Sequence, residues 1–189
     1  TSGEEPLFAP AEVKLKVGNA APQITNVPNP LTPVPVSLIP GGTQTVLVQF
    51  TARDANGYDD LNDASATASF TKTGEATRTA SCSVNSHPNN KETIYNCNVP
   101  MEYYDAAGLD WVITFFIQDK ATPTPASASD NTARANVYEL KAITFASPID
   151  LGTLNPGATN SLSSDIVITN QGNFVGNIIL NSADLVGVT

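Results

Sequence analysis

The sequence predicts an all-β protein, in which a β-sandwich is followed by a second, smaller β-module. Two observations carry this prediction. No stretch of helical length places apolar residues at the spacing of an α-helix, whereas apolar and polar residues alternate repeatedly with the period of a strand. Glycine, proline, asparagine and aspartate separate the alternating runs, and short strands divided in this way are typical of β-sandwiches.

The first module is predicted to span residues 20–141. Its most apolar run, Trp111–Gln118, places alternate large apolar side chains on one face and is therefore expected to be a central strand of the core. Further strands are predicted at Thr45–Ala52, Ala66–Thr71 and Ala135–Leu140. The stretch Pro22–Pro40 is rich in proline, which has no amide hydrogen for a sheet ladder. We expect this stretch to be an edge strand or an extended segment along the sandwich.

Residues 1–19 are predicted to be an extended N-terminal segment. Val13, Leu15 and Val17 alternate with charged residues, which is a strand pattern without an obvious partner nearby in the sequence. The segment can be the N-terminal edge strand of the sandwich or a donor strand that inserts into a neighbouring subunit. Strand addition of the second kind uses main-chain hydrogen bonds for affinity and alternate side chains for register.

The second module is predicted to span residues 142–189. It shows strand patterns at Ile143–Phe145, Leu151–Leu154, Asp165–Thr169 and Asn177–Leu180. So few strands are marginal in water, because they cannot bury their apolar faces. We therefore expect this module to be incomplete, either because the chain is a fragment of a longer protein or because another copy of the chain completes it.

Charge and composition argue against several classes of protein. Eighteen acidic residues face nine scattered basic residues, and the formal net charge of −9 would repel a phosphate backbone, so no nucleic-acid partner is predicted. No apolar stretch is long enough for a membrane-spanning helix. The N-terminal residues Thr1–Pro6 are polar and acidic, unlike a signal peptide, and we expect a secreted protein whose signal peptide has been removed.

The two cysteines predict a disulfide across a hairpin. Cys82 and Cys97 lie in alternating runs on either side of the polar stretch Ser86–Lys91, which is expected to form the turn. A disulfide that closes such a loop contributes about 3 kcal/mol in the chain-entropy model. It also implies an oxidising, extracytoplasmic setting. The alternative is a pair of free buried thiols.

Acidic and amide side chains are densest between residues 54 and 63, directly after a predicted strand. Calcium takes about six to eight oxygen ligands, which short Asp and Asn side chains on a tight turn can supply. The site could borrow a carboxylate from the end of the Trp111 strand, or Asp105 and Asp110. The predicted calcium ligands are Asp54, Asn56, Asp59, Asp60 and Asp119. The alternative is a solvated acidic turn whose side chains cap their own backbone.

Nothing in the sequence predicts an enzyme. The single histidine, His87, lies in the polar hairpin stretch, and neither a nucleophile elbow nor a phosphate-binding glycine loop occurs. Glu102, Asp105 and Asp110 could hold the carboxylate pair of a glycosidase, although nothing in the sequence sets their separation.

Several motifs are similar to those of a known class of modules. The stretch Phe50–Leu61 contains an Asp-x-Asn-Gly turn, and Tyr95–Cys97, Tyr103–Gly108 and Trp111 follow it. Together they resemble immunoglobulin-like and PKD-like β-sandwich modules of secreted archaeal cell-surface or filament proteins, and residues 152–173 are similar to the β-modules that follow in such proteins. The chain departs from heavily N-glycosylated relatives because it contains no Asn-x-Ser/Thr sequon.

The resemblance implies an immunoglobulin-like fold and an extracellular structural, adhesive or filament-forming protein. We expect a subunit that polymerises with copies of itself into a filament or cell-surface array by β-strand exchange. The alternative is an adhesive or carbohydrate-binding module from a larger surface protein. Its glycan partner would stack on Tyr103 and Tyr104, which can equally be core or corner residues.

Overall fold

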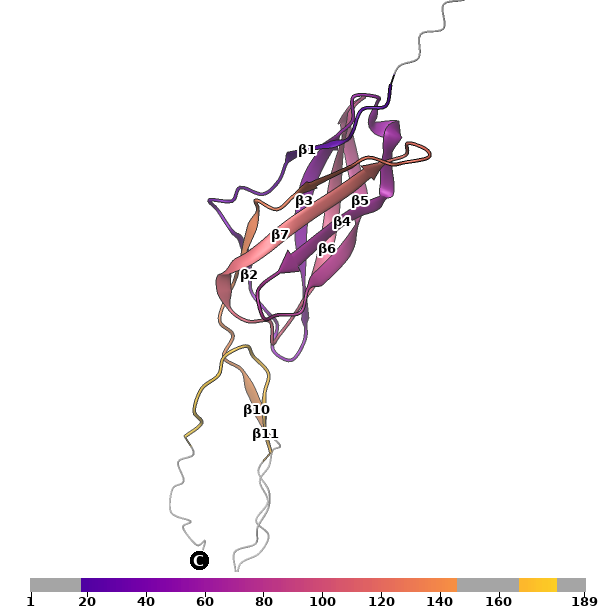
Figure 1. The fold of residues 1–189 in the computed structure, drawn as a ribbon. Helices are drawn as coiled ribbons and strands as arrows, with labels where there is room; N and C mark the ends of the chain where they lie inside the picture. The colour runs from indigo at the N-terminus through magenta and orange to yellow at the C-terminus, as the bar shows by residue number, and fades with distance from the viewer. Residues whose placement is uncertain (1–17, 146–166, 180–189) are drawn as a thin grey trace, which may run out of the picture.

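The computed structural model describes residues 18–145 and 167–179 and confirms the predicted all-β class (Figure 1). These residues form eleven strands and one short 3-10 helix, η1 (Tyr58–Asp60), and contain no α-helix. Most strands build an elongated sandwich, and a two-stranded sheet lies beyond one end of it. The predicted donor residues Val13, Leu15 and Val17 lie outside the described residues.

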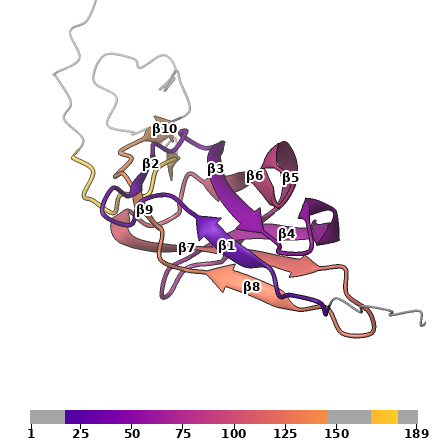
Figure 2. The same cartoon turned by 90° about the horizontal axis from the view of Figure 1, so that it is seen from above.

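The sandwich is one continuous run of paired strands that curls into two layers. In the first layer the order is β1 (Gln23–Asn26), β3 (Thr43–Arg53), β6 (Glu92–Glu102) and β5 (Arg78–Asn89). In the second layer the order is β4 (Leu61–Thr71), β7 (Gly108–Asp119), β9 (Arg134–Val137) and β2 (Val34–Val36). A further strand, β8 (Ser127–Asp130), lies alongside β7, as the view from above shows (Figure 2).

This strand order is that of an immunoglobulin-like sandwich, in which strands A-B-E-D form one sheet and C-F-G the other. β1, β3, β6 and β5 take the places of A, B, E and D, and β4, β7 and β9 take those of C, F and G. β2 pairs in parallel with β9. The two layers share β5, because its first residues pair with β4 up to Ser81 and its later residues pair with β6 from Cys82 onward.

The core lies between the layers and follows the predicted alternation. Trp111, Ile113 and Phe115 on β7 are fully buried, which confirms the predicted face of this strand. The ring of Phe50 on β3 lies 5.0 Å from that of Tyr95 on β6 and 5.1 Å from that of Phe115, measured between centroids. The contact of Phe50 with Phe115 joins the layers, because β3 belongs to one and β7 to the other.

The proline-rich stretch was predicted to be an edge strand or an extended segment, and it supplies the strands at both ends of the strand order. β1 stands at one end of the order and β2 at the other. Pro35 lies within β2, where a missing amide hydrogen does not interrupt a central ladder. β2 still contributes to the core, since Val36 is buried.

The disulfide is confirmed, but the turn beside it is shorter than predicted. Cys82 and Cys97 are opposite each other in the pairing of β5 with β6 and are bonded. The strands continue through much of the stretch expected to be a loop, and the turn comprises only Asn90 and Lys91. Register shifts between Val84 and Asn89 interrupt the period of two, which explains why this part of β5 has the sequence pattern of a loop.

The second module contains an antiparallel pair of short strands, β10 (Ile143–Phe145) and β11 (Ile168–Asn170). They correspond to two of the predicted strand patterns and do not pair with the main sheet. The described part of a third pattern, Asn177–Ile179, does not form a strand. The predicted strand pattern at Leu151–Leu154 lies outside the described residues.

Hydrogen bonds from one loop attach the second sheet to the sandwich. The side-chain oxygen of Asn173 accepts a bond of 2.6 Å from the amide of Leu140, and its Nδ2 donates to the backbone oxygens of Asp105 at 2.9 Å and Tyr138 at 3.0 Å. The amide of Gly41 donates to the backbone oxygen of Gln171 at 3.0 Å. The loop after β11 is thus bonded to the loop before β3, the loop before β7 and the segment after β9.

Gly172 in this loop has no room for a side chain, which leads to a first prediction. A Cβ atom there would lie 2.0 Å from the backbone oxygen of Leu140 and 3.0 Å from the amide nitrogen of Ala142. In Gly172→Ala the junction has to open and lose hydrogen bonds worth about 1 kcal/mol each. We expect faster hydrogen exchange at the Leu140 and Asn173 amides and little change in the core of the sandwich.

The matched control is Gly42→Ala at the same end of the sandwich. A Cβ atom at Gly42 would meet Ile39 at 3.4 Å, an ordinary contact. Exchange at Leu140 should therefore keep its wild-type rate in this variant. Equal acceleration in both variants would contradict the role given to the loop.

Candidate functional site

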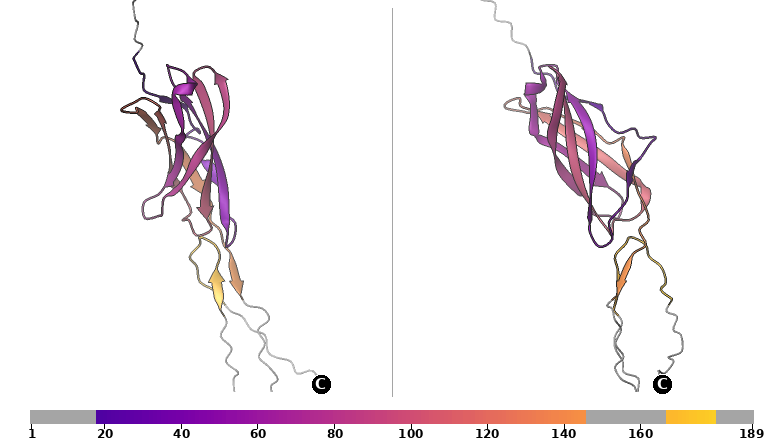
Figure 3. Two further views of the ribbon diagram at one scale, coloured as in Figure 1. Left: turned by 90° about the vertical axis from the view of Figure 1, so that its right-hand side faces the viewer. Right: turned by 180° about the vertical axis from the view of Figure 1, so that it is seen from behind.

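Two candidate regions lie at opposite ends of the sandwich (Figure 3). The first is a group of carboxylates where β3 and β7 end and η1 begins. The second is an exposed apolar surface around β10 and β11. The sequence drew attention to both, through the acidic turn and through the incomplete second module.

The acidic cluster consists of Asp54, Asp60 and Asp119. One carboxylate oxygen from each lies within 4.8 Å of the others. Asp54 directly follows β3, Asp60 ends η1 and Asp119 ends β7. Asp54 and Asp119 are fully buried, and Asp60 is half-buried.

The turn that carries two of these carboxylates is shaped by its own backbone. Gly57 has a φ of 124°, a conformation that residues with a side chain rarely adopt, and it directly precedes η1. The Oδ1 atom of Asp54 accepts a hydrogen bond of 2.8 Å from the amide of Asn56. The amide of Asp54 donates to the backbone oxygen of Lys91 at 2.9 Å, and that of Lys120 donates to the oxygen of Asp60 at 2.7 Å. The turn is therefore attached both to the β5–β6 hairpin and to the end of β7.

Asp119 is well satisfied by hydrogen bonds. Its Oδ2 accepts a bond of 2.7 Å from Nδ2 of Asn19, and its Oδ1 accepts bonds from the amides of Ala126 at 2.8 Å and Ala121 at 3.1 Å. Burial acts to raise the pKa of Asp119, but these hydrogen bonds together outweigh it, and the pKa lies below its ordinary value. Asp119 is therefore held in its charged form.

Asp54 is in the opposite situation. Its Oδ2 atom is buried without a hydrogen-bond partner, and it is the one such side-chain atom in the described residues. Burial raises the pKa of Asp54, and the negative charges of Asp60 and Asp119 raise it further. No lysine or arginine of residues 18–145 or 167–179 forms an ion pair with any of the three carboxylates. The cluster thus lacks a positive counter-charge in this part of the chain.

The structure brings together three of the five predicted calcium ligands. Asn56 uses its side chain elsewhere: its Oδ1 accepts a bond of 2.8 Å from the amide of Ala20, and its Nδ2 donates to the backbone oxygen of Gly18 at 3.3 Å. Asp59 is exposed and lies outside the cluster. The contact of Asn19 with Asp119 was not foreseen, because no sequence pattern links residues that far apart.

Two of the three carboxylates considered for glycoside hydrolysis are engaged in separate ion pairs, and the third, that of Glu102, accepts a hydrogen bond of 3.0 Å from the hydroxyl of Thr43. Asp105 is buried against Arg78, and the exposed Asp110 pairs with Lys72. The rings of Tyr103 and Tyr104 meet edge to face at 5.0 Å, and the guanidinium of Arg78 lies 5.4 Å from the centre of the Tyr104 ring. A glycan that stacks on Tyr103 and Tyr104 would meet two rings at right angles to each other. Glycan binding at these tyrosines stays a prediction.

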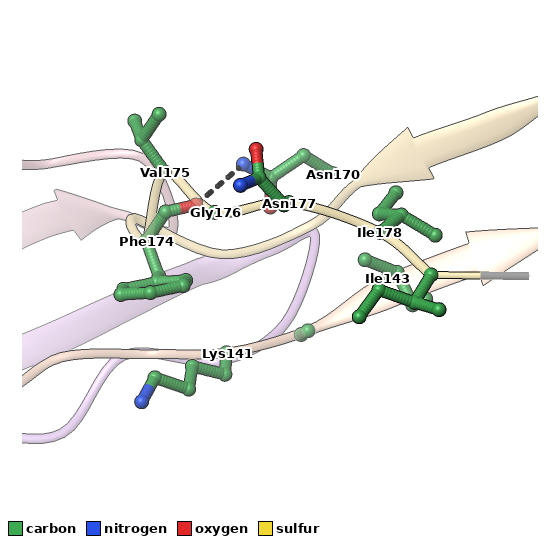
Figure 4. A pocket seen from close by; sticks show the side chains of 10 residues that line it. Lys141, Ile143, Asn170, Phe174, Val175, Gly176, Asn177 and Ile178 are labelled. Carbon is green, nitrogen blue, oxygen red and sulfur yellow. Dashed lines mark hydrogen bonds between the residues drawn. The ribbon is translucent and has the colours of Figure 1, made fainter.

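The apolar surface at the other end contains a groove of about 500 Å³ beside β10 and β11 (Figure 4). Ile143 and Ile178 lie on one side of it, and Phe174 lies near Lys141, whose Nζ is 4.5 Å from the ring centre. Many of the apolar side chains here are exposed, with Val175 at 93% and Ile179 at 81%. A surface of this kind usually marks a binding region.

The fold and the bonded cysteines define a disulfide-containing, immunoglobulin-like β-sandwich with a small second sheet. Comparison with known proteins does not narrow this class, since no protein-family model, curated protein or solved structure matches the chain. Within the described residues, no helix has the length and apolar character needed to cross a membrane.

Proposed function

We propose that this protein is an extracellular structural subunit that polymerises with copies of itself by β-strand addition at the second sheet. One observation carries the proposal. Among the described residues, β10 and β11 form a sheet of two strands, three residues each, and the apolar side chains of β10 are exposed.

Such a sheet gains from another strand for two reasons. Two strands alone are marginal in water, and the free edge of a strand presents unpaired amide and carbonyl groups to a partner. In β10 the side chains of Ile143 and Phe145 point to the same face, as alternate residues of a strand do. They are 51% and 59% exposed. An added strand with apolar residues at every second position would pair with the edge and cover these side chains.

The donor that fits this description lies in the same sequence. Val13, Leu15 and Val17 alternate with charged residues directly before Gly18. The indigo start of the described chain lies at the end of the sandwich opposite to β10 and β11 (Figure 1). A subunit with its donor at one end and its acceptor at the other joins head to tail, and a head-to-tail contact that does not close into a ring builds a filament.

The bonded cysteines support an extracellular location. Disulfides persist in oxidising compartments and are rare in the cytosol. The net charge of −9 favours solubility of the free subunit before it assembles.

The proposal is tested by mixing two variants, each with one defective end. Leu15→Asp removes the donor's central apolar side chain, and the acceptor variant carries Ile143→Asp with Phe145→Asp. The wild-type chain is expected to form filaments visible by negative-stain electron microscopy. Each variant alone should sediment at the monomer mass of 19.8 kDa, whereas an equal mixture should form dimers and nothing longer.

The matched control replaces charged side chains that alternate with the apolar residues of the donor. Lys14→Ser with Lys16→Ser leaves the apolar positions intact and should assemble as the wild type does. Normal filaments from a chain that lacks residues 1–18 would overturn strand donation by this segment. Monomers in the mixture of the two variants would overturn it equally.

A further inference from the structure

We infer that Asp54, Asp60 and Asp119 form a binding site for Ca²⁺, and that the bound ion fixes the residues through which the N-terminal segment joins the sandwich. The inference stands apart from the proposed assembly. It rests on the orphaned oxygen of Asp54 and on the hydrogen bonds between the acidic turn and residues 18–20.

The unpartnered Oδ2 atom of Asp54 indicates a missing ligand. A buried carboxylate oxygen without a hydrogen-bond partner is costly, and a second and third carboxylate within 4.8 Å add repulsion. A divalent cation between the three oxygens would satisfy the orphaned atom and offset the negative charge at once. No lysine or arginine of the described residues offsets this negative charge, since none of them forms an ion pair with the cluster.

The donor set is chemically that of calcium. Three carboxylates provide hard oxygen ligands, which Ca²⁺ accepts in flexible geometry with backbone oxygens and water completing the shell. Mg²⁺ needs a near-ideal octahedron and gives up its water reluctantly. Zn²⁺ prefers histidine and cysteine. Here both cysteines are bonded to each other, and the ring of His87 stacks on Tyr58 with its Nδ1 3.0 Å from the hydroxyl of Thr93.

The same turn also holds the start of the described chain. Asn19 donates to the carboxylate of Asp119, and Ala20 donates to Asn56, whose own amide donates to Asp54. Residues 18–20 are thus bonded directly to Asp119, and through Asn56 to Asp54. An ion that draws the three carboxylates together would hold these bonds in place and so fix residues 18–20 on the sandwich.

Thermal unfolding after removal of metal by EDTA tests the site. At a free Ca²⁺ concentration about 100-fold above its dissociation constant, the midpoint of the wild-type chain should rise by about 5–10 °C. In Asp54→Asn the amide can donate to the two remaining carboxylates, so the metal-free midpoint should exceed that of the wild type while the response to Ca²⁺ is lost. Asp60→Asn, at a half-buried position, should lose the response as well.

Asp59→Asn is the matched control, because it removes the same charge from the same turn but outside the cluster. It should keep the full response to Ca²⁺. In the wild type, Ca²⁺ should also slow hydrogen exchange of the Ala20 amide, and it should not do so in Asp54→Asn. The inference is overturned if the wild type does not respond, if the Asp54 and Asp59 variants respond alike, or if Mg²⁺ or NaCl of equal ionic strength gives the same shift.

Discussion

Replacing Asp105 with alanine is expected to lower the free energy of unfolding by about 3–5 kcal/mol, the loss typical of removing one partner from a buried ion pair. The Asp105 carboxylate is fully buried and accepts bonds from the guanidinium of Arg78 and, at 2.7 Å, from the amide of Glu102. Without it, the guanidinium of Arg78, whose side chain is only 16% exposed, loses its counter-charge. The turn before β7 also loses the acceptor of one of its amides.

Asp110→Ala is the matched control for this prediction. Asp110 pairs with Lys72, but its side chain is 64% exposed, and Lys72, although 13% exposed, keeps the bond of 2.9 Å that its Nζ donates to the backbone oxygen of Ala107, so we expect a loss of about 0–1 kcal/mol. Urea unfolding followed by the fluorescence of Trp111 measures both losses. Equal losses, or a small loss in Asp105→Ala, would show that the buried pair does not hold the turn.

Removing the disulfide is expected to have the second-largest effect. The bond joins residues 15 positions apart, and in the chain-entropy model a loop of this size contributes about 3 kcal/mol. A chain with Cys82→Ala and Cys97→Ala should therefore unfold about 6–12 °C lower than the wild type. Cys97 is fully buried and belongs to the core, so part of the loss comes from packing.

Reduction separates the effect of the bond from that of packing. A reductant should lower the midpoint of the wild type toward that of the double variant and leave the variant unchanged. A wild type that keeps its midpoint after complete reduction, verified by mass spectrometry, would refute the stabilising role of the bond.

Local patterns in the sequence predicted the parts of the fold that depend on one segment or two neighbouring ones. The buried face of the Trp111 strand follows from alternation alone, and the disulfide follows from two alternating runs on either side of a polar stretch. β8 was missed because Ser127–Asp130 has small and polar side chains without an apolar face. Its pairing with β7 gives it the strand conformation.

The acidic cluster was likewise predictable where it depends on local sequence and not where it depends on the three-dimensional fold. Asp54 and Asp60 could be grouped because they belong to one turn, and Asp119 could be added because it ends a predicted core strand. Asp60 belongs to the cluster and Asp59 does not. Composition could not distinguish the two, because the backbone path of η1 decides which side chain reaches the cluster. A turn around Asn173 was indicated by the residues 169–173, but its hydrogen bonds were not predicted, because they join segments distant in sequence.

The parallel pairing of β2 with β9 has a mechanical consequence. The described chain begins at one end of the sandwich and leaves for β10 at the other (Figure 1). If subunits join as proposed, tension between them would therefore pull along the strands. Because β2 and β9 run in the same direction, the pull on β2 toward the start of the chain opposes the pull on β9 toward its end. The pair of β2 and β9 is therefore loaded in shear, so its hydrogen bonds must break together and not one after another.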